Sequence, residues 1–157
     1  MAKKKSSSAK KLCLLFGILF ALVSVVLFLL LDVFSLTIPV IGNYAFTGIE
    51  LVFGCKTQYL ESELLKFNYV ALIVIILPVL GILLSVFVKK NKLLGLIASL
   101  LFLASGIMMF IIPSYASIGY SDALSILNLK SSLEIGSIIG GSANILAFLS
   151  VLYAKVI

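Results

Sequence analysis

Histidine, arginine and tryptophan are all absent from this chain of 157 residues, which contains only two cysteines and three prolines. Without histidine there is no imidazole to act as a general base or as a metal ligand. No Cys-x-x-Cys pair, phosphate-binding loop or metal-binding helix motif is present in its place. No nucleophile stands beside a base in any arrangement that the spacing suggests. We therefore expect a protein that is not an enzyme and that holds no metal or cofactor.

Charged residues are also scarce, at 11% of the chain, whereas hydrophobic residues make up 62% and the mean hydropathy is +1.29. Such values exclude an ordinary soluble domain. Four apolar runs are long enough to cross the ~30 Å of a bilayer core as helices, the only spanning state open to isolated segments of this length. The predicted spans are Leu12–Leu31, Phe67–Val88, Leu93–Ile112 and Ile135–Ala154.

The lysines predict the orientation of these spans. Nine of the twelve lie in the first eleven residues, in the turn 89–92 and at Lys155, and these segments contain no acidic residue. The segments 32–66 and 113–134 contain three lysines and all six acidic residues, a net charge of −3. Because lysine-rich segments remain in the cytoplasm, both termini are predicted to be cytoplasmic in a multi-pass protein of the cell membrane. The net charge of +6 then reflects topology and attraction to lipid, not binding of nucleic acid.

The first eleven residues, rich in lysine and serine, are predicted to form a disordered tail. The run that follows them is longer than the core of a secretory signal, and no small-residue cleavage site follows it. We expect this run to remain as a membrane anchor. Cys13 lies in it and Cys55 in the first outer segment, about a bilayer apart, so no disulfide between them is expected.

The predicted fold is all-α: a four-helix transmembrane bundle over residues 12–157, with a small extracytoplasmic cap built mainly from Val33–Leu65. Within the cap, Thr47–Gly54 is bounded by glycine and could be a short strand or a segment lying along the membrane surface. The sequence from Thr57 onward is typical of a helix that continues into the second span. A further short helix, capped by Ser121, is expected in the second outer segment.

The last span contains small residues at helical spacing. Gly136 and Gly140 lie one turn apart, and the same face places Asn144 at the centre of the apolar run. Small residues let helices approach closely, and a buried amide needs a hydrogen-bond partner. Helix packing and the lining of a substrate path are both compatible with this pattern. Candidate partners for the amide are Ser24, Ser85, Ser99 and Ser105.

Three further residues are candidates for function. Pro78 lies in the middle of the second span, where it leaves a backbone carbonyl unpaired, and it fits either a kink or a gate. Glu50 is flanked by apolar residues in the cap and is either an outer-loop contact or an ordinary exposed carboxylate. Cys55 is either a free thiol or a partner in an intermolecular disulfide.

The lysine-only basic residues and the stretch Thr47-Gly-Ile-Glu-Leu-Val-Phe-Gly54 resemble those of small four-span membrane proteins of unknown function from low-GC Gram-positive bacteria. The layout is also similar to the claudin group, with four helices, both ends inside and a larger first outer segment. That group has a Gly-Leu-Trp and two cysteines in this segment. Here the corresponding residues are Gly48-Ile49-Glu50 and a single cysteine, Cys55.

Two hypotheses of function follow. The first is an accessory subunit or cell-envelope interaction protein that acts through helix–helix and outer-loop contacts, with a membrane protein or a second copy of the chain as partner. The alternative is a small oligomeric transporter or channel, with Asn144 and Pro78 facing the path. The spans contain no acidic residue at depth, which argues against an ion-coupled carrier.

Overall fold

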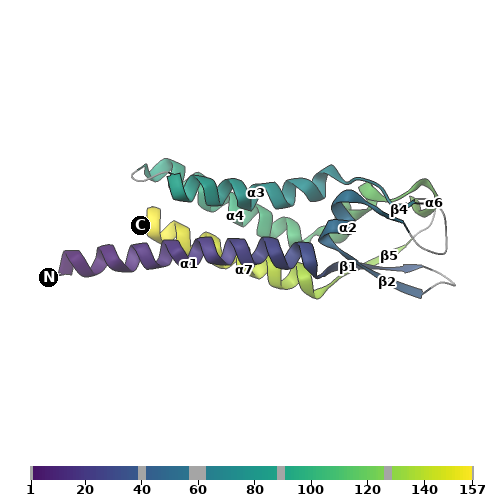
Figure 1. Cartoon of the computed structure of the whole chain (residues 1–157), viewed down its shortest axis with the longest axis horizontal. Helices are drawn as coiled ribbons and strands as arrows, with labels where there is room; N and C mark the ends of the chain where they lie inside the picture. Colours follow the sequence, from purple (N-terminus) through teal and green to yellow (C-terminus); the bar gives the residue numbers. More distant parts are fainter. Residues whose placement is uncertain (1, 39–41, 57–62, 88–90, 126–128, 157) are drawn as a thin grey trace.

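A computed structural model describes residues 2–38, 42–56, 63–87, 91–125 and 129–156. Among these residues, four helices are long and apolar enough to cross a membrane, as the sequence predicts. Figure 1 shows that they lie side by side, with both chain termini at one end of the bundle and the strands at the other. We call these the terminal end and the cap end. The four helices are α1 (Ala2–Leu30), α3 (Tyr69–Phe87), α4 (Lys92–Phe110) and α7 (Ile135–Lys155).

Two helix ends differ from the expected ones. The helix α1 begins at Ala2, ten residues before Leu12, the expected start of the first span. The helix α3 begins two residues later than expected, because the side chain of Asn68 caps it. Oδ1 of Asn68 accepts hydrogen bonds from the backbone N–H groups of Val70 and Ala71, at 3.0 and 3.1 Å.

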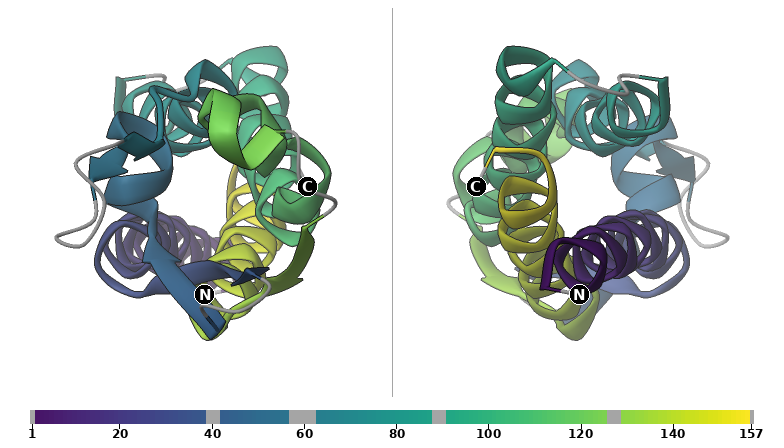
Figure 2. Two further views of the ribbon diagram at one scale, coloured as in Figure 1. Left: turned by 90° about the vertical axis from the view of Figure 1, so that its right-hand side faces the viewer. Right: turned by 90° about the vertical axis from the view of Figure 1, so that its left-hand side faces the viewer.

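Seen from either end, the helices form a ring in which α1 neighbours α7, α7 neighbours α4, and α4 neighbours α3 (Figure 2). The pairing of α3 with α4 is the one that their short connection predicts. Close approach depends on small residues: a Cβ atom at Gly81 of α3 would lie 2.8 Å from the ring of Phe102 on α4. At the cap end, a short helix fills the space between α1 and α3. This helix is α2 (Gly48–Phe53), and its Val52 carbonyl accepts the Asn68 backbone N–H at 2.9 Å.

The chain is mostly helical, as the all-α prediction expects, but the cap also contains strands. Three of them form an antiparallel sheet in the order β2-β1-β5. Their bounds are β1 (Asp32–Ile38), β2 (Gly42–Thr47) and β5 (Lys130–Leu133). In this sheet Phe34 pairs with Phe46 on one side and with Leu133 on the other, so residues from both segments predicted to lie outside the membrane share one sheet.

Two segments of the cap differ in secondary structure from what the sequence suggested. Residues 48–53 form the helix α2, because Thr47 begins a helix, so of the two alternatives for Thr47–Gly54 the short strand is excluded. The segment expected to be helical from Thr57 contains the strand β4 (Glu63–Leu65), which pairs with β3 (Cys55–Lys56); residues 57–62 lie outside the described residues.

The second part of the cap contains α5 (Ile112–Tyr115), the 3₁₀ helix η1 (Ala116–Gly119) and α6 (Asp122–Ser125). The short helix predicted after Ser121 is therefore present as α6. Ser121 directly precedes this helix, and its backbone carbonyl accepts the N–H groups of Leu124 and Ser125, as the carbonyl of an N-cap residue does. The Ser121 hydroxyl itself is buried and has no partner among the described residues.

One apolar core joins the cap to the bundle. Buried side chains of β1, β2, α2 and β4 pack against the cap-end turns of α1, α3 and α4. The largest fully buried members are Phe28, Phe34, Leu36, Leu51, Leu65, Met109 and Ile112. A smaller cluster of Ala21, Phe102, Ala147 and Val151 fills the bundle away from the cap. The cap is thus packed onto the helices and is not a set of loose loops.

Candidate functional site

The small-residue face of α7 lies inside the chain, against α1, α4 and the start of β1. A Cβ atom at Gly136 would lie 2.6 Å from the backbone oxygen of Asp32. A Cβ atom at Gly140 would lie 3.2 Å from Sδ of Met109 and 3.4 Å from the backbone oxygen of Ser24. Of the interpretations open for this face, the contacts fit close helix packing within one chain.

Asn144 on α7 and Pro78 on α3 are brought together by a third residue, Ser105 on α4. The Asn144 amide nitrogen Nδ2 donates to Oγ of Ser105 at 2.9 Å, and this hydroxyl donates to the backbone oxygen of Val74 at 2.8 Å. Val74 precedes Pro78 by four residues, and proline has no N–H to give to that carbonyl. The Ser105 hydroxyl therefore pairs the carbonyl that Pro78 leaves free, and α7, α4 and α3 become linked.

A second hydrogen bond adds α1 to this arrangement. The hydroxyl of Ser24 donates to the backbone oxygen of Gly140 at 2.7 Å, and its Oγ lies 3.6 Å from Sδ of Met109. Asn144 Nδ2 lies 3.7 Å from the same sulfur. Buried hydrogen bonds thus connect all four helices, and we call this set of residues the polar cluster: Ser24, Val74, Ser105, Met109, Gly140 and Asn144.

The four serines predicted as partners behave differently. Only Ser105 reaches Asn144; Ser24 reaches the carbonyl of Gly140 instead. Ser99 bonds to the backbone oxygen of Leu96 on its own helix at 2.7 Å, and Ser85 is buried with no partner among the described residues. Oδ1 of Asn144 is also buried and unpaired within the described part of the chain.

Glu50 is engaged at the start of α2. Its Oε2 accepts hydrogen bonds from the backbone N–H and the hydroxyl of Thr47, at 2.8 and 2.9 Å, and its own backbone N–H donates to the Thr47 hydroxyl. This reciprocal pairing is a capping box, which the spacing Thr-x-x-Glu signals. The Glu50 carboxylate therefore helps to hold the cap together, with its residue only partly exposed.

Cys55 is a free, half-buried thiol in β3. Burial raises its pKa, the nearby carboxylate of Glu50 raises it further, and a backbone hydrogen bond with Leu65 opposes the shift. Cys55 therefore remains protonated and weakly nucleophilic at neutral pH. Cys13 lies in α1, partly exposed and also free.

Cys55 lines a cavity of about 330 Å³ between the β3–β4 hairpin and the start of α3, a site that the sequence did not predict. Its charged residues are Lys56, Glu63 and Lys66, and its rings are Phe53 and Phe67. The ring centroids lie 6.4 Å apart, and Nζ of Lys56 lies 3.7 Å from a carboxylate oxygen of Glu63. No spacing of residues signals such a site, because its walls come from segments that meet only in the folded cap.

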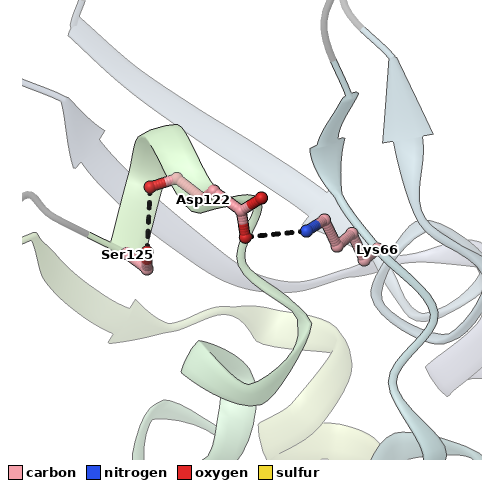
Figure 3. Close-up of polar contacts among 3 residues, drawn as sticks. All are labelled: Lys66, Asp122 and Ser125. Carbon is pink, nitrogen blue, oxygen red and sulfur yellow. Dashed lines mark hydrogen bonds and ion pairs between the residues drawn. The ribbon is translucent and has the colours of Figure 1, made fainter.

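Lys66 also fixes the cavity to the second half of the cap. Its Nζ lies 2.8 Å from Oδ1 of Asp122, and the hydroxyl of Ser125 donates to the Asp122 backbone oxygen at 2.9 Å (Figure 3). The backbone N–H of Lys66 donates to the Gly119 oxygen at 2.7 Å. Two groups of one segment, the Gly119 carbonyl and the Asp122 carboxylate, thus hold this lysine at the edge of the cavity.

Comparison of the chain with protein-family models, curated proteins and solved structures finds no match. The polar cluster holds four helices in a fixed arrangement, and the cavity offers amines, a thiol and aromatic rings at the boundary between cap and bundle.

Proposed function

We propose that this is a non-enzymatic multi-pass membrane protein that acts through contacts made by its cap, as an accessory subunit or a cell-envelope interaction protein. The observation that carries the proposal is the construction of the cap. Strands from segments about a hundred residues apart pair in one sheet, and the sheet shares its core with the helices. A preformed, rigid surface is what a docking platform needs, because little entropy is lost when it binds.

The polar cluster supports the same proposal. The side-chain hydroxyls of Ser24 and Ser105 and the amide nitrogen of Asn144 are all bonded to neighbouring helices. Polar groups used in this way stabilise the bundle and are not available to line a path. The bundle then serves as a scaffold for the cap.

The proposed orientation places the cap outside the cell. The described acidic residues all lie in the cap or at its junction with the bundle. The lysines Lys10, Lys11, Lys92 and Lys155 lie near the terminal end. Lysine-rich ends remain in the cytoplasm, so a cap facing outward is the arrangement that the charges favour.

Photocrosslinking in native membranes tests the proposal. Ile49 on α2 and Ile118 on η1 are exposed side chains of the cap, at 44% and 46%. Benzoylphenylalanine at either position should give a discrete adduct, and mass spectrometry should identify the same membrane protein, or a second copy of the chain, from both. Leu83 on α3 is 47% exposed and provides a matched control that should crosslink only to lipid. Recovery of monomer and lipid alone from both cap positions would count against a contact role.

A small oligomeric transporter or channel is the second candidate. Oδ1 of Asn144 favours it, because this buried oxygen has no partner within the described residues and could face a passing solute. Flux through proteoliposomes should then be lost in the Asn144→Leu variant. Flux that survives both Asn144→Leu and Pro78→Ala would remove this version.

A further inference from the structure

The cavity beside Cys55 has a charged part and an aromatic part. Lys56, Glu63 and Lys66 come from the strands β3 and β4 and from the residue after β4. The rings of Phe53 and Phe67 come from the end of α2 and the residue before Asn68, which caps α3. A cavity with these two parts suits an amphiphilic ligand.

The aromatic part lies where the bilayer surface would meet the protein. Phe67 directly precedes the cap of α3, one of the four helices able to cross a membrane. Phe53 and Phe67 are 64% and 53% exposed, and such exposure is costly in water but favourable against lipid. Aromatic side chains are enriched at this depth because their rings suit the headgroup region. The inference therefore rests on α3 crossing a membrane.

The charged part can accept an anion. The side chains of Lys56 and Glu63 are 70% and 54% exposed, and those of Lys66 and Asp122 are 46% and 95% exposed. Ion pairs with this much exposure contribute little free energy, because solvent screens them. A phosphate with several acceptor oxygens could therefore take hydrogen bonds from both ammonium groups without a large cost.

We propose that this cavity binds the phosphate group of a membrane phospholipid, with Lys56 and Lys66 on the phosphate and with Phe53 and Phe67 against the acyl chains. A free phosphate ion could bind the same two lysines. The aromatic rings of Phe53 and Phe67 favour a lipid over a free ion, because only a lipid has acyl chains to pack against them. The proposal goes beyond the contact role above and needs no protein partner, so either can fail without the other.

Cys55 provides a native reporter, because it lines the cavity and Cys13 is the other cysteine of the chain. The experiment uses the full chain with Cys13→Ser in a neutral detergent and measures the rate at which a maleimide alkylates Cys55. Dioctanoyl phosphatidylglycerol should slow this alkylation in a saturable way. Dioctanoylglycerol, which has similar chains and no phosphate, and inorganic phosphate, which has no chains, should not slow it over the same concentration range.

Variants give the expected signs. Lys56→Gln and Lys66→Gln should each raise the lipid concentration for half-protection by up to about fivefold, because each removes one charged contact of an exposed lysine. Lys130→Gln makes the same charge change on β5, outside the cavity lining, and should leave that concentration unchanged. Glu63→Gln should lower it, because one competing carboxylate is removed. Each variant is compared with its own rate without lipid, which cancels any direct effect on the thiol.

Three results would overturn the proposal. Equal protection by dioctanoylglycerol would show that only the apolar chains bind. Equal protection by inorganic phosphate would show an anion site with no lipid in it. Equal half-protection in Lys56→Gln, Lys66→Gln and Lys130→Gln would show that the cavity lysines do not bind the phosphate. If Lys66→Gln does not yield folded protein, Lys66→Arg retains the charge and should keep the protection, while Lys56→Gln carries the test.

Discussion

Ser105 offers the sharpest test of how the bundle is held together. The Ser105→Ala substitution removes two buried hydrogen bonds, one from Asn144 and one to the carbonyl of Val74. Interhelical hydrogen bonds in membranes are worth about 0.6 kcal/mol on average and about 1.7 kcal/mol at most. The two bonds together therefore predict a loss of about 1–3 kcal/mol in the free energy of unfolding.

Pro78 makes this prediction specific. In the Pro78→Ala background, residue 78 regains an N–H that can pair with the Val74 carbonyl along α3. Ser105→Ala then leaves only the Asn144 amide unpaired, whereas in the wild type it also leaves the Val74 carbonyl unpaired. The loss of unfolding free energy should therefore be about half as large, which corresponds to a coupling energy of roughly 0.6 kcal/mol or more between the two sites. This double-mutant cycle isolates the serine–carbonyl bond from the other effects of removing a proline.

The measurement is unfolding by SDS in mixed micelles, followed by tyrosine circular dichroism in the near ultraviolet. Ser99→Ala is the matched control, because Ser99 is equally buried on α4 but bonds only within its own helix. It should change stability by less than about 0.5 kcal/mol. If Ser105→Ala costs the same with and without Pro78, the serine does not serve the carbonyl that proline frees, and the reasoning is refuted.

The remaining predictions concern α7 and the cap. Gly136→Ala should lower the free energy of unfolding by about 1–3 kcal/mol in the same assay, because its Cβ atom would press on the backbone of β1. Gly140→Ala should lower it by less, because its Cβ atom meets a flexible methionine side chain. A larger loss in Gly140→Ala than in Gly136→Ala would contradict the packing described above. Thr47→Ala removes the capping box of α2 and should lower the free energy of unfolding by about 1 kcal/mol. An unchanged melting temperature would show that the capping box does not stabilise the protein. Because burial and Glu50 raise the pKa of Cys55, its thiolate forms only at higher pH than in a free peptide, so its alkylation rate should rise later along a pH series. A rate profile matching that of a free peptide would contradict this.

The sequence predicted the four spans and part of the polar cluster because lipid imposes strict rules on a chain. In lipid, long apolar runs must be helical, and a buried amide such as that of Asn144 is expected to form a hydrogen bond with a neighbouring helix. Ser24 and Ser105 were among the candidates, but spacing along one helix cannot say which neighbour it faces. The link between Pro78 and Ser105 needed the three-dimensional arrangement of α3 and α4.

The cap was harder to predict because its strands depend on distant partners. Leu64 and Leu65 suit a helix locally, yet β4 pairs with β3, and Leu65 forms a bridge with Tyr120 from the other half of the cap. The sequence does contain a signal for the helix α2, because Thr47 and Glu50 have the spacing of a capping box. The glycines that bound this stretch left a short strand and a segment along the membrane surface as the two alternatives.

The pairing of β1 with β5 has a consequence for how the protein is made. The strand β1 follows α1, and β5 precedes α7. The pairing of β1 with β5 therefore cannot form until most of the chain has been synthesised. The hydroxyl of Ser137, near the start of α7, then donates a hydrogen bond to the backbone oxygen of Val33 and links α7 to β1. A chain that stalls after α4 would present one edge of β1 without a neighbour, a known cause of aggregation. Closure of the sheet thus coincides with the arrival of α7, so the cap can be completed only when the last of the four long helices is present.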